Sequence, residues 1–190
     1  MEALEKRIMS EGEVRPGGIL KVDGFLNHRI DPQLSYDMAV ELKRLYEGEE
    51  INKILTIEAS GIAMAVMVGY VFGCPLVFAK KSKTKNISSN VWSTEVESFT
   101  HGNTNTVVVP KEYLGPEDKV LIVDDFLATG AALKGLRALV EQAGGTVVGA
   151  GIAIEKAFQG GGDELRRSGM RVESLARIAS MSDDSLEFVR

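Results

Sequence analysis

The sequence contains one cysteine and two histidines among its 190 residues. Cys74 has no second cysteine to pair with, which excludes a small secreted fold held together by internal disulfides. His28 and His101 lie far apart in the chain, so the usual set of zinc ligands is absent. Acidic residues outnumber basic ones by 27 to 22, and a net charge of −5 argues against the broad basic surface that nucleic-acid binding requires. We therefore expect any chemistry to depend on carboxylates, lysines and backbone amides.

Long uninterrupted hydrophobic runs are scarce as well. The first ten residues alternate charged and apolar side chains, so they lack the apolar core of a secretory signal. Residues 61–79 carry no charge and are long enough to cross a bilayer, but Gly73 and Pro75 divide them into a helix-like half and a strand-like half. A buried helix followed by a buried strand explains the same composition. We expect a cytoplasmic protein that makes no contact with a membrane.

The chain does contain aliphatic strands that alternate with helical patterns. The expected strands are 19–22, 53–57, 76–79, 119–123, 146–154 and 172–178, and the expected helices are 2–12, 31–45, 62–72, 131–143 and 163–168. Solid aliphatic strands between helices predict an α/β fold whose central, mainly parallel sheet is flanked by helices. Ligands of such sheets bind at the carboxyl ends of the strands. Because no repeat or linker interrupts the pattern, residues 1–190 are predicted to form a single domain.

Two segments depart from this alternation. Residues 80–90, KKSKTKNISSN, are polar and carry four lysines in their first six positions, which predicts a flexible surface loop. Residues 91–99 and 106–109 have the composition of paired strands, and they predict a hairpin joined through residues 100–103.

The strongest signal for function is the run VLIVDDFLATGAAL at residues 120–133. A buried strand ends in Asp124 and Asp125, and residues 128–130 then open a helix. Paired carboxylates can accept hydrogen bonds from vicinal sugar hydroxyls or help to hold Mg²⁺ through water, while amides at a helix N-terminus favour an anion. Taken separately, the pair could be a solvated strand end and Thr129 a helix cap. Together at one strand-to-helix junction, they favour a site for a phosphorylated sugar.

The same run resembles the phosphoribosyl-pyrophosphate (PRPP) motif of the type I phosphoribosyltransferases. Four further segments resemble the bacterial xanthine phosphoribosyltransferases in particular: LKVDGFLNHRIDP (20–32), TIEASGI (56–62), AIEKAF (153–158) and RVESLARI (171–178). The resemblance implies the type I fold, in which a small hood and a flexible loop and hairpin accompany the central sheet. The hood would be built from about the first thirty residues and the C-terminal segment. The resemblance also implies a homodimer.

The resemblance implies roles for residues around PRPP. The catalytic acidic pair, Asp124 and Asp125, would hold the ribose hydroxyls. The 5′-phosphate would lie on a loop made of Ala128, Thr129, Gly130, Ala131 and Ala132. Ala128 stands where the commonest form of the motif has threonine, which removes one hydroxyl but leaves the amides. The pyrophosphate would lie on a loop of unusual backbone geometry made of Glu58, Ala59, Ser60 and Gly61. Lys80 or, preferably, Lys81 would supply charge there, and Mg²⁺ would be carried by PRPP without a direct protein ligand.

Two parts of the chain, the end of the strand 146–154 and the hood, bear on which base binds. Lys156 follows the strand 146–154, and an ammonium group only donates hydrogen bonds, so it suits a 6-oxo group or N7 and not a 6-amino group. This favours an oxopurine over adenine. Phe158 either stacks on the base or packs in the core. The resemblance also places Leu20 and Asn27 of the hood on the base, where the Asn27 amide can both donate to and accept from a 2-oxo purine.

The expected activity is transfer of the 5-phosphoribosyl group from PRPP to N9 of xanthine, with Mg²⁺, giving xanthosine 5′-monophosphate (XMP) and pyrophosphate. One alternative is a hypoxanthine or guanine phosphoribosyltransferase. The other is a purine regulator that binds PRPP without catalysis, and such a protein would need a DNA-binding module.

Overall fold

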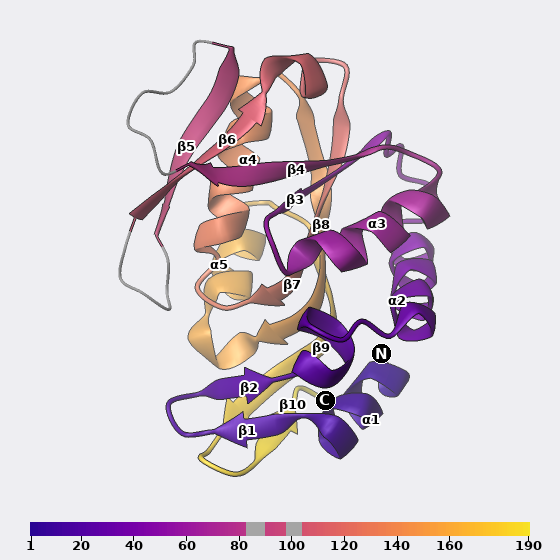
Figure 1. Ribbon diagram of the computed structural model, residues 1–190, viewed down its shortest axis with the longest axis vertical. Coiled ribbons are helices and arrows are strands. Elements are labelled where there is room, and N and C mark those ends of the chain that lie inside the picture. The colour runs from indigo at the N-terminus through magenta and orange to yellow at the C-terminus, as the bar shows by residue number, and fades with distance from the viewer. Residues whose placement is uncertain (83–89, 98–103) are drawn as a thin grey trace.

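The structure, a computed structural model, describes residues 1–82, 90–97 and 104–190. Among these residues, eight strands form the main sheet (Figure 1), in the order β10 (Leu186–Phe188), β9 (Val172–Met181), β8 (Thr146–Lys156), β7 (Lys119–Leu127), β3 (Lys53–Ile57), β4 (Leu76–Ser82), β6 (Thr104–Pro110) and β5 (Val91–Glu97). The five strands from β9 to β4 pair in parallel, and the strands outside them pair antiparallel. The predicted α/β fold with a mainly parallel sheet is confirmed.

Helices cover both faces of the sheet, which is why β7 reads as an unbroken aliphatic run. Leu121 and Val123 pack into one core with the helices α2 (Pro32–Leu45) and α3 (Gly61–Phe72). Val120 and Ile122 point the other way, into a second core with the helix α4 (Ala131–Gln142). The short helix α5 (Gly161–Arg167) contributes Leu165 to this second core. Alternate residues from Val120 to Val123 of β7 therefore serve two cores, and both faces of that stretch are apolar.

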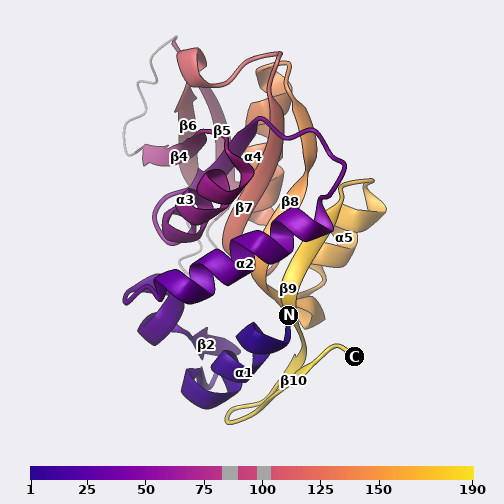
Figure 2. The ribbon, with the colours of Figure 1, turned by 90° about the vertical axis from the view of Figure 1, so that its right-hand side faces the viewer.

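The hood consists of α1 (Glu2–Glu11), the two-stranded sheet of β1 (Glu13–Arg15) and β2 (Ile19–Lys21), the π-helix η1 (Asp23–Asn27) and β10. Leu4, Phe25 and Phe188 belong to the core that also contains α2 and α3. Figure 1 and Figure 2 both place the two chain ends close together at the hood. In Figure 1 the arrowheads of β7 and β8 point toward it, so the hood stands at the carboxyl ends of these strands.

The prediction of a loop at residues 80–90 is wrong at its start. Lys80 and Lys81 lie in β4, where they pair with Val108 and Val107 of β6. The partner strand lies beyond residue 100, so its hydrogen bonds are invisible in a local reading of a lysine-rich segment. Residues 83–89 are outside the described part of the chain.

The predicted hairpin is confirmed as the antiparallel pair β5 and β6, while its tip at residues 100–103, including His101, is not described. No helix in the described ranges is long and apolar enough to cross a membrane. The expected strand 19–22 is present as β2, and the hood strands β1 and β10 were not predicted.

A buried ion-pair network on β8, also missed by the sequence analysis, ties α5 to the sheet. Glu155 is fully buried, and its carboxylate accepts hydrogen bonds from Arg166 at 2.7 and 2.8 Å and from Arg177 at 3.2 Å. Burial alone raises the pKa of Glu155, but the hydrogen bonds from Arg166 and the charges of both arginines outweigh it and lower the pKa below its ordinary value. The network joins β8, β9 and α5.

Replacing Glu155 by glutamine should destabilise the fold, because both arginines lose their buried counter-charge. We expect a loss of about 2 kcal/mol at pH 7, less than for a fully buried pair, since the arginine side chains are 29% and 34% exposed. Because the pKa of Glu155 is lowered in the folded state, its ionised carboxylate stabilises the fold at pH values above the ordinary glutamate pKa, near 4.3. This stabilisation is lost as the pH falls through the folded-state pKa. The difference between wild type and E155Q should therefore narrow below about pH 4.

Urea unfolding at pH 7 and in steps down to pH 3 measures both effects. Glu164→Gln is the matched control, because Glu164 pairs with Lys134 at an exposed position and its loss should change stability little. Equal unfolding free energies for wild type and E155Q at pH 7 would contradict the assignment.

Candidate active site

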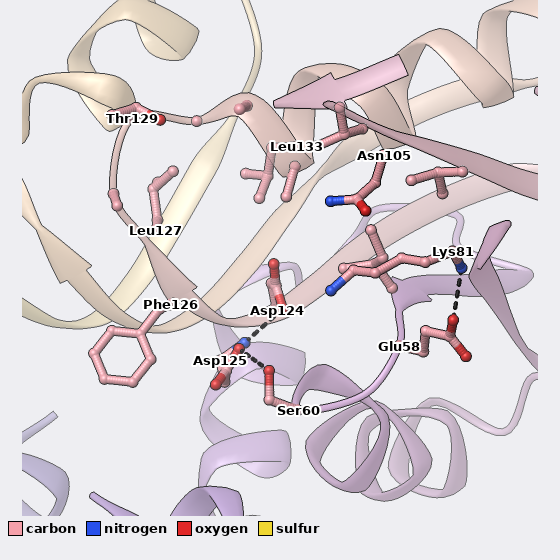
Figure 3. Close-up of a pocket in the computed structure, with 17 residues that line it drawn as sticks. Glu58, Ser60, Lys81, Asn105, Asp124, Asp125, Phe126, Leu127, Thr129 and Leu133 are labelled. Atoms are coloured by element: carbon pink, nitrogen blue, oxygen red, sulfur yellow. Dashed lines mark hydrogen bonds between the residues drawn. The ribbon is translucent and has the colours of Figure 1, made fainter. Parts of the chain in front are cut away.

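A cavity of about 210 Å³ lies where β7 turns into α4. Four segments line it (Figure 3): the end of β7 with the loop that follows, the loop between β3 and α3, the end of β4, and the hairpin of β5 and β6. Its walls include Glu58, Ser60, Lys81, Asn105, Asp124, Asp125, Phe126, Ala128, Thr129, Gly130, Ala131 and Ala132. The acidic pair, the candidate phosphate loop and part of the candidate pyrophosphate loop therefore share one cavity.

The acidic pair forms the floor of the cavity. Asp124 and Asp125 are only 5% and 6% exposed, yet both line the pocket. The backbone N–H of Asp125 donates to Oδ1 of Asp124 at 3.0 Å, and the Ser60 hydroxyl donates to Oδ1 of Asp125 at 3.0 Å. The strand does not end at the pair as predicted: β7 continues to Leu127, because β8 extends beside it. The reading of the pair as a solvated strand end is wrong, since both carboxylates are buried.

Burial raises the pKa of Asp124 well above its ordinary value, and the negative charge of Asp125 raises it further. Two ionised carboxylates this close repel one another in a site with little water. A positive ion or a set of hydroxyl donors at the same place relieves both costs. The pair is therefore suited to the vicinal hydroxyls of a sugar or to a nearby cation.

The loop after β7 exposes the start of α4. Gly130 has a φ of +83°, in the left-handed region that favours glycine, and it precedes the first helical residue. No side chain caps this helix, so the alternative that Thr129 is a cap is wrong. The first amides of α4 thus lack the side-chain partner that a helix N-terminus usually has. Amides in that condition, beside a left-handed glycine, suit a phosphate group.

Gly161, at the start of α5, supports this loop from behind. A Cβ atom at position 161 would lie 2.3 Å from the Ala128 oxygen, 2.3 Å from the Thr129 carbonyl carbon and 2.6 Å from the Gly130 nitrogen. These are backbone atoms, which cannot move aside like the end of a side chain. The expected helix at residues 163–168 starts two residues earlier, and its first residue packs directly on the candidate phosphate loop.

The loop between β3 and α3 faces the acidic pair from the other side. The peptide bond between Glu58 and Ala59 is cis, which confirms the expected unusual backbone geometry. Glu58 accepts a hydrogen bond from the Lys81 backbone N–H at 2.6 Å, and this contact joins the loop to β4. Glu58 and Ser60 line the cavity, whereas Ala59 is exposed and outside the lining. Gly61 is buried behind the lining, where a Cβ would lie 2.8 Å from an Asp124 oxygen.

The two lysines at the end of β4 point to opposite faces of the strand. Lys81 lines the cavity, and its side chain extends toward the acidic pair in Figure 3. Lys80 instead lies over the ring of Phe78, 5.6 Å from the centroid, on the outer face of the sheet. The preference for Lys81 over Lys80 follows from this alternation.

The four residues expected at the base lie outside the lining of this cavity. Lys156 donates a hydrogen bond to the Gly18 carbonyl of the hood at 2.8 Å and lies 5.6 Å from the ring centroid of Phe126, which does line the cavity. Burial lowers the pKa of Lys156. Asn27 holds a buried Oδ1 atom that has no hydrogen-bond partner in the described structure. A buried, unpartnered acceptor is costly, and a ligand N–H would satisfy it.

The other two base candidates differ in exposure. Phe158 is 43% exposed, so the alternative of a core aromatic is wrong, and its ring is free to meet a ligand. Leu20 is buried in the hood core at 6% exposure. Lys156 contacts both Gly18 of the hood and Phe126 of the cavity wall, and so connects the hood to the cavity.

Sequence reasoning missed the apolar part of the cavity wall and two further residues, Phe126 and Asn105. Phe126 directly follows the acidic pair, and its position in the motif was the available signal. Asn105 shares one face of β6 with Val107 and Val109, which the sequence shows only once the start of the strand at residue 104 is known. In the described part of the chain, no three His, Cys, Asp or Glu side chains are grouped to hold a metal ion.

Comparisons with known proteins identify a family and full-length relatives. A profile of the family described as the phosphoribosyl transferase domain matches residues 29–167. The chain is 54% identical over 188 residues to the xanthine phosphoribosyltransferase of Finegoldia magna, which covers 99% of both chains. It is 48% identical over 190 residues to the xanthine phosphoribosyltransferase of Limosilactobacillus reuteri, with full coverage of both.

Solved structures show the same fold. An adenine phosphoribosyltransferase from Thermoanaerobacter pseudethanolicus superposes with a TM-score of 0.74 at 26% identity, covering 92% of this chain and 99% of its own. The APRTase of Giardia lamblia, complexed with 9-deazaadenine, superposes with a TM-score of 0.77 at 22% identity, covering 92% of this chain and 97% of its own. At that identity the second comparison shows the fold alone.

Replacing Gly161 by alanine should displace the loop at 128–132 and weaken binding of a phosphate ester there. We expect about tenfold weaker binding of ribose 5-phosphate, because overpacking against backbone typically costs 1–3 kcal/mol. Binding of inorganic pyrophosphate, expected on the β3–α3 loop, should change little. Calorimetry with each ligand separates the two. Gly115→Ala is the control, since its Cβ would meet nothing within 4 Å. Unchanged ribose 5-phosphate binding in G161A would contradict the support role.

Replacing Asp124 by asparagine should stabilise the ligand-free protein. Because the folded-state pKa is raised, the ionised carboxylate costs stability as pH rises above the ordinary aspartate value, near 3.9. Asparagine removes that charge and keeps an oxygen for the Asp125 N–H. We expect a Tm gain of roughly 2–4 °C at pH 8 and less at pH 5, the shift that about 1 kcal/mol produces in a chain of this size. Thermal unfolding checks it, with exposed Asp183→Asn as control. A lower Tm for D124N at pH 8 would refute the argument.

Proposed function

The chain belongs to the phosphoribosyltransferase family, and on that premise we propose that it transfers the 5-phosphoribosyl group from PRPP to N9 of xanthine, producing XMP and pyrophosphate. One observation carries the proposal: a buried pair of carboxylates and an uncapped helix N-terminus share a single cavity. A phosphorylated sugar carries hydroxyls that suit the carboxylates and a phosphate that suits the helix N-terminus. The names of relatives that match over the full chain support xanthine as the base.

The three parts of PRPP can be assigned to three parts of the cavity. The 5′-phosphate lies on residues 128–132, where the start of α4 offers amides. The ribose hydroxyls donate to Asp124 and Asp125, and the pyrophosphate lies between the β3–α3 loop and Lys81. Ser60 links the last two regions, because its hydroxyl contacts Asp125. The three parts of PRPP therefore meet three different elements of the fold.

The reaction demands charge stabilisation more than covalent chemistry. N9 of the base attacks C1 of the ribose, the N9–C1 bond forms, and the C1–O bond to pyrophosphate breaks with its electron pair leaving on pyrophosphate. The proton on N9 is released to solvent. Positive charge that develops on the ribose is stabilised by the acidic pair beside it. Positioning of both reactants by rigid loops supplies much of the remaining acceleration.

The residues present suit a magnesium ion that PRPP carries. The buried acidic pair, with the raised pKa of Asp124, favours a cation close by, and the described residues offer no complete set of protein ligands. When bound, Mg²⁺ would offset the negative charge of the leaving pyrophosphate. Lys81 adds a positive charge at the same end of the cavity.

The base site is proposed between the cavity and the hood. Lys156 uses one of its three N–H donors on the Gly18 carbonyl and retains two for a 6-oxo group or N7. The unpartnered Oδ1 of Asn27 accepts a ring N–H of a 2-oxo purine. Phe126 and the exposed Phe158 offer aromatic faces for stacking. Leu20 supplies an apolar contact from the hood core.

We further propose that residues 1–190 form one phosphoribosyltransferase domain that works as a homodimer in the cytoplasm. Large apolar side chains on α3 and β4 are exposed, among them Val66, Tyr70 and Phe78. Burying such side chains against a second copy would stabilise a dimer.

A base panel tests the function. Purified protein is mixed with PRPP and Mg²⁺ and with xanthine, hypoxanthine, guanine or adenine, and nucleotide and pyrophosphate are both quantified. We expect the highest kcat/KM for xanthine and the lowest for adenine. Asp125→Asn serves as the inactive control, since it removes one of the two charges beside the ribose.

The other outcomes are informative. A preference for hypoxanthine or guanine would identify that base, in place of xanthine, as the substrate. A preference for adenine would overturn the argument from Lys156. Binding of PRPP with no release of pyrophosphate on any base would identify a regulator in place of an enzyme.

A further inference from the structure

We infer that Asn105, on the hairpin strand β6, contacts the diphosphate of PRPP through its side-chain amide. The inference rests on the proposed function and adds a substrate contact from a part of the chain that the acidic motif does not include. Asn105 lines the cavity together with Lys81 and the start of α4. In Figure 3 its amide points into the cavity, between Leu133 and Lys81.

The alternation of β6 places Asn105 on the inner face of the hairpin. Val107 and Val109 occupy the same face and are completely buried in the core that contains α4. Asn105 is next in this row, toward the carboxyl end of β4, where the core gives way to the cavity. A third valine would continue the core, whereas the amide is a polar group at the position that first meets the ligand.

The packing of the hairpin on α4 fixes where this amide lies. Val96 of β5 is the cross-strand partner of Asn105. A Cβ at Gly135 of α4 would lie 2.3 Å from a Val96 methyl carbon, so β5 approaches the helix as closely as the missing side chain allows. The same helix begins at the candidate phosphate loop. Hairpin and loop are therefore held at a fixed spacing, and Asn105 faces the space between them.

The Asn105 amide has hydrogen-bonding capacity to spare. No hydrogen bond joins its side chain to another residue in the described ranges. An amide can donate two hydrogen bonds, and phosphate oxygens accept them readily. Phe126, whose ring lies beside the base candidate Lys156, is on the opposite side of the acidic pair in Figure 3. Because Lys81, proposed for the diphosphate, is the charged group that neighbours Asn105 in Figure 3, we assign the amide to the diphosphate.

Three variants test the contact. Asn105→Ala removes the donor and should raise KM for PRPP and weaken inorganic pyrophosphate binding about tenfold, as expected for a hydrogen bond to a charged group. Asn105→Asp keeps the shape but places a negative charge beside the diphosphate, so its loss should be larger. Thr106→Val is the matched control, one position along and on the other face of β6. KM for xanthine and Tm should stay within error in all three.

The outcomes separate this inference from the proposed function. Wild-type formation of XMP is measured in the same assays, and its absence would overturn the function. If wild type is active while N105A behaves as wild type, or N105D loses no more than N105A, the Asn105 contact is wrong. Equal increases in KM for PRPP and for xanthine in N105A, together with a lowered Tm, would also overturn the Asn105 contact, because they would indicate a structural role.

Discussion

The organisation of the cavity depends on the burial of two carboxylates side by side at the end of β7. Asp124 and Asp125 cannot both be ionised there at low cost unless something positive or hydrogen-bond donating is near. The surroundings stabilise the two charges in part, because a Ser60 hydroxyl, a backbone amide and the Lys81 charge all face the pair. The remainder is left for the substrate. If the ribose binds there as proposed, the energetic cost of burying the pair would contribute to binding energy.

The loops around this pair are shaped by backbone contacts more than by side chains. Gly61 lies against Asp124, and Gly161 lies against the loop at 128–130, each at a distance that excludes a methyl group. Behind Gly161, the ion pairs of Glu155 hold α5 on the sheet. The candidate phosphate loop therefore rests on a helix that is itself fixed by buried charges, which gives the amides a rigid frame.

Local patterns in the sequence predicted most of the fold and about half of the candidate cavity. The strand β7 could be predicted because a strand that is buried on both faces is almost entirely aliphatic, and the acidic pair stands out against such a run. The strand position of Lys81 was not, since its hydrogen bonds come from a strand some 25 residues away. Asn105 and Glu155 were missed for the same reason. Their significance lies in neighbours that become adjacent only when the chain folds.

The opposite orientation of Lys80 and Lys81 has a consequence for how this chain can change over evolution. Because side chains on a strand alternate, the insertion or deletion of one residue within β4 would turn the cavity lysine outward and bring its neighbour in. It would also move Phe78 from the outer face into the protein. Changes of two residues would preserve the pattern. Insertions and deletions in this strand should thus involve even numbers of residues, because the pleat turns alternate side chains to opposite faces.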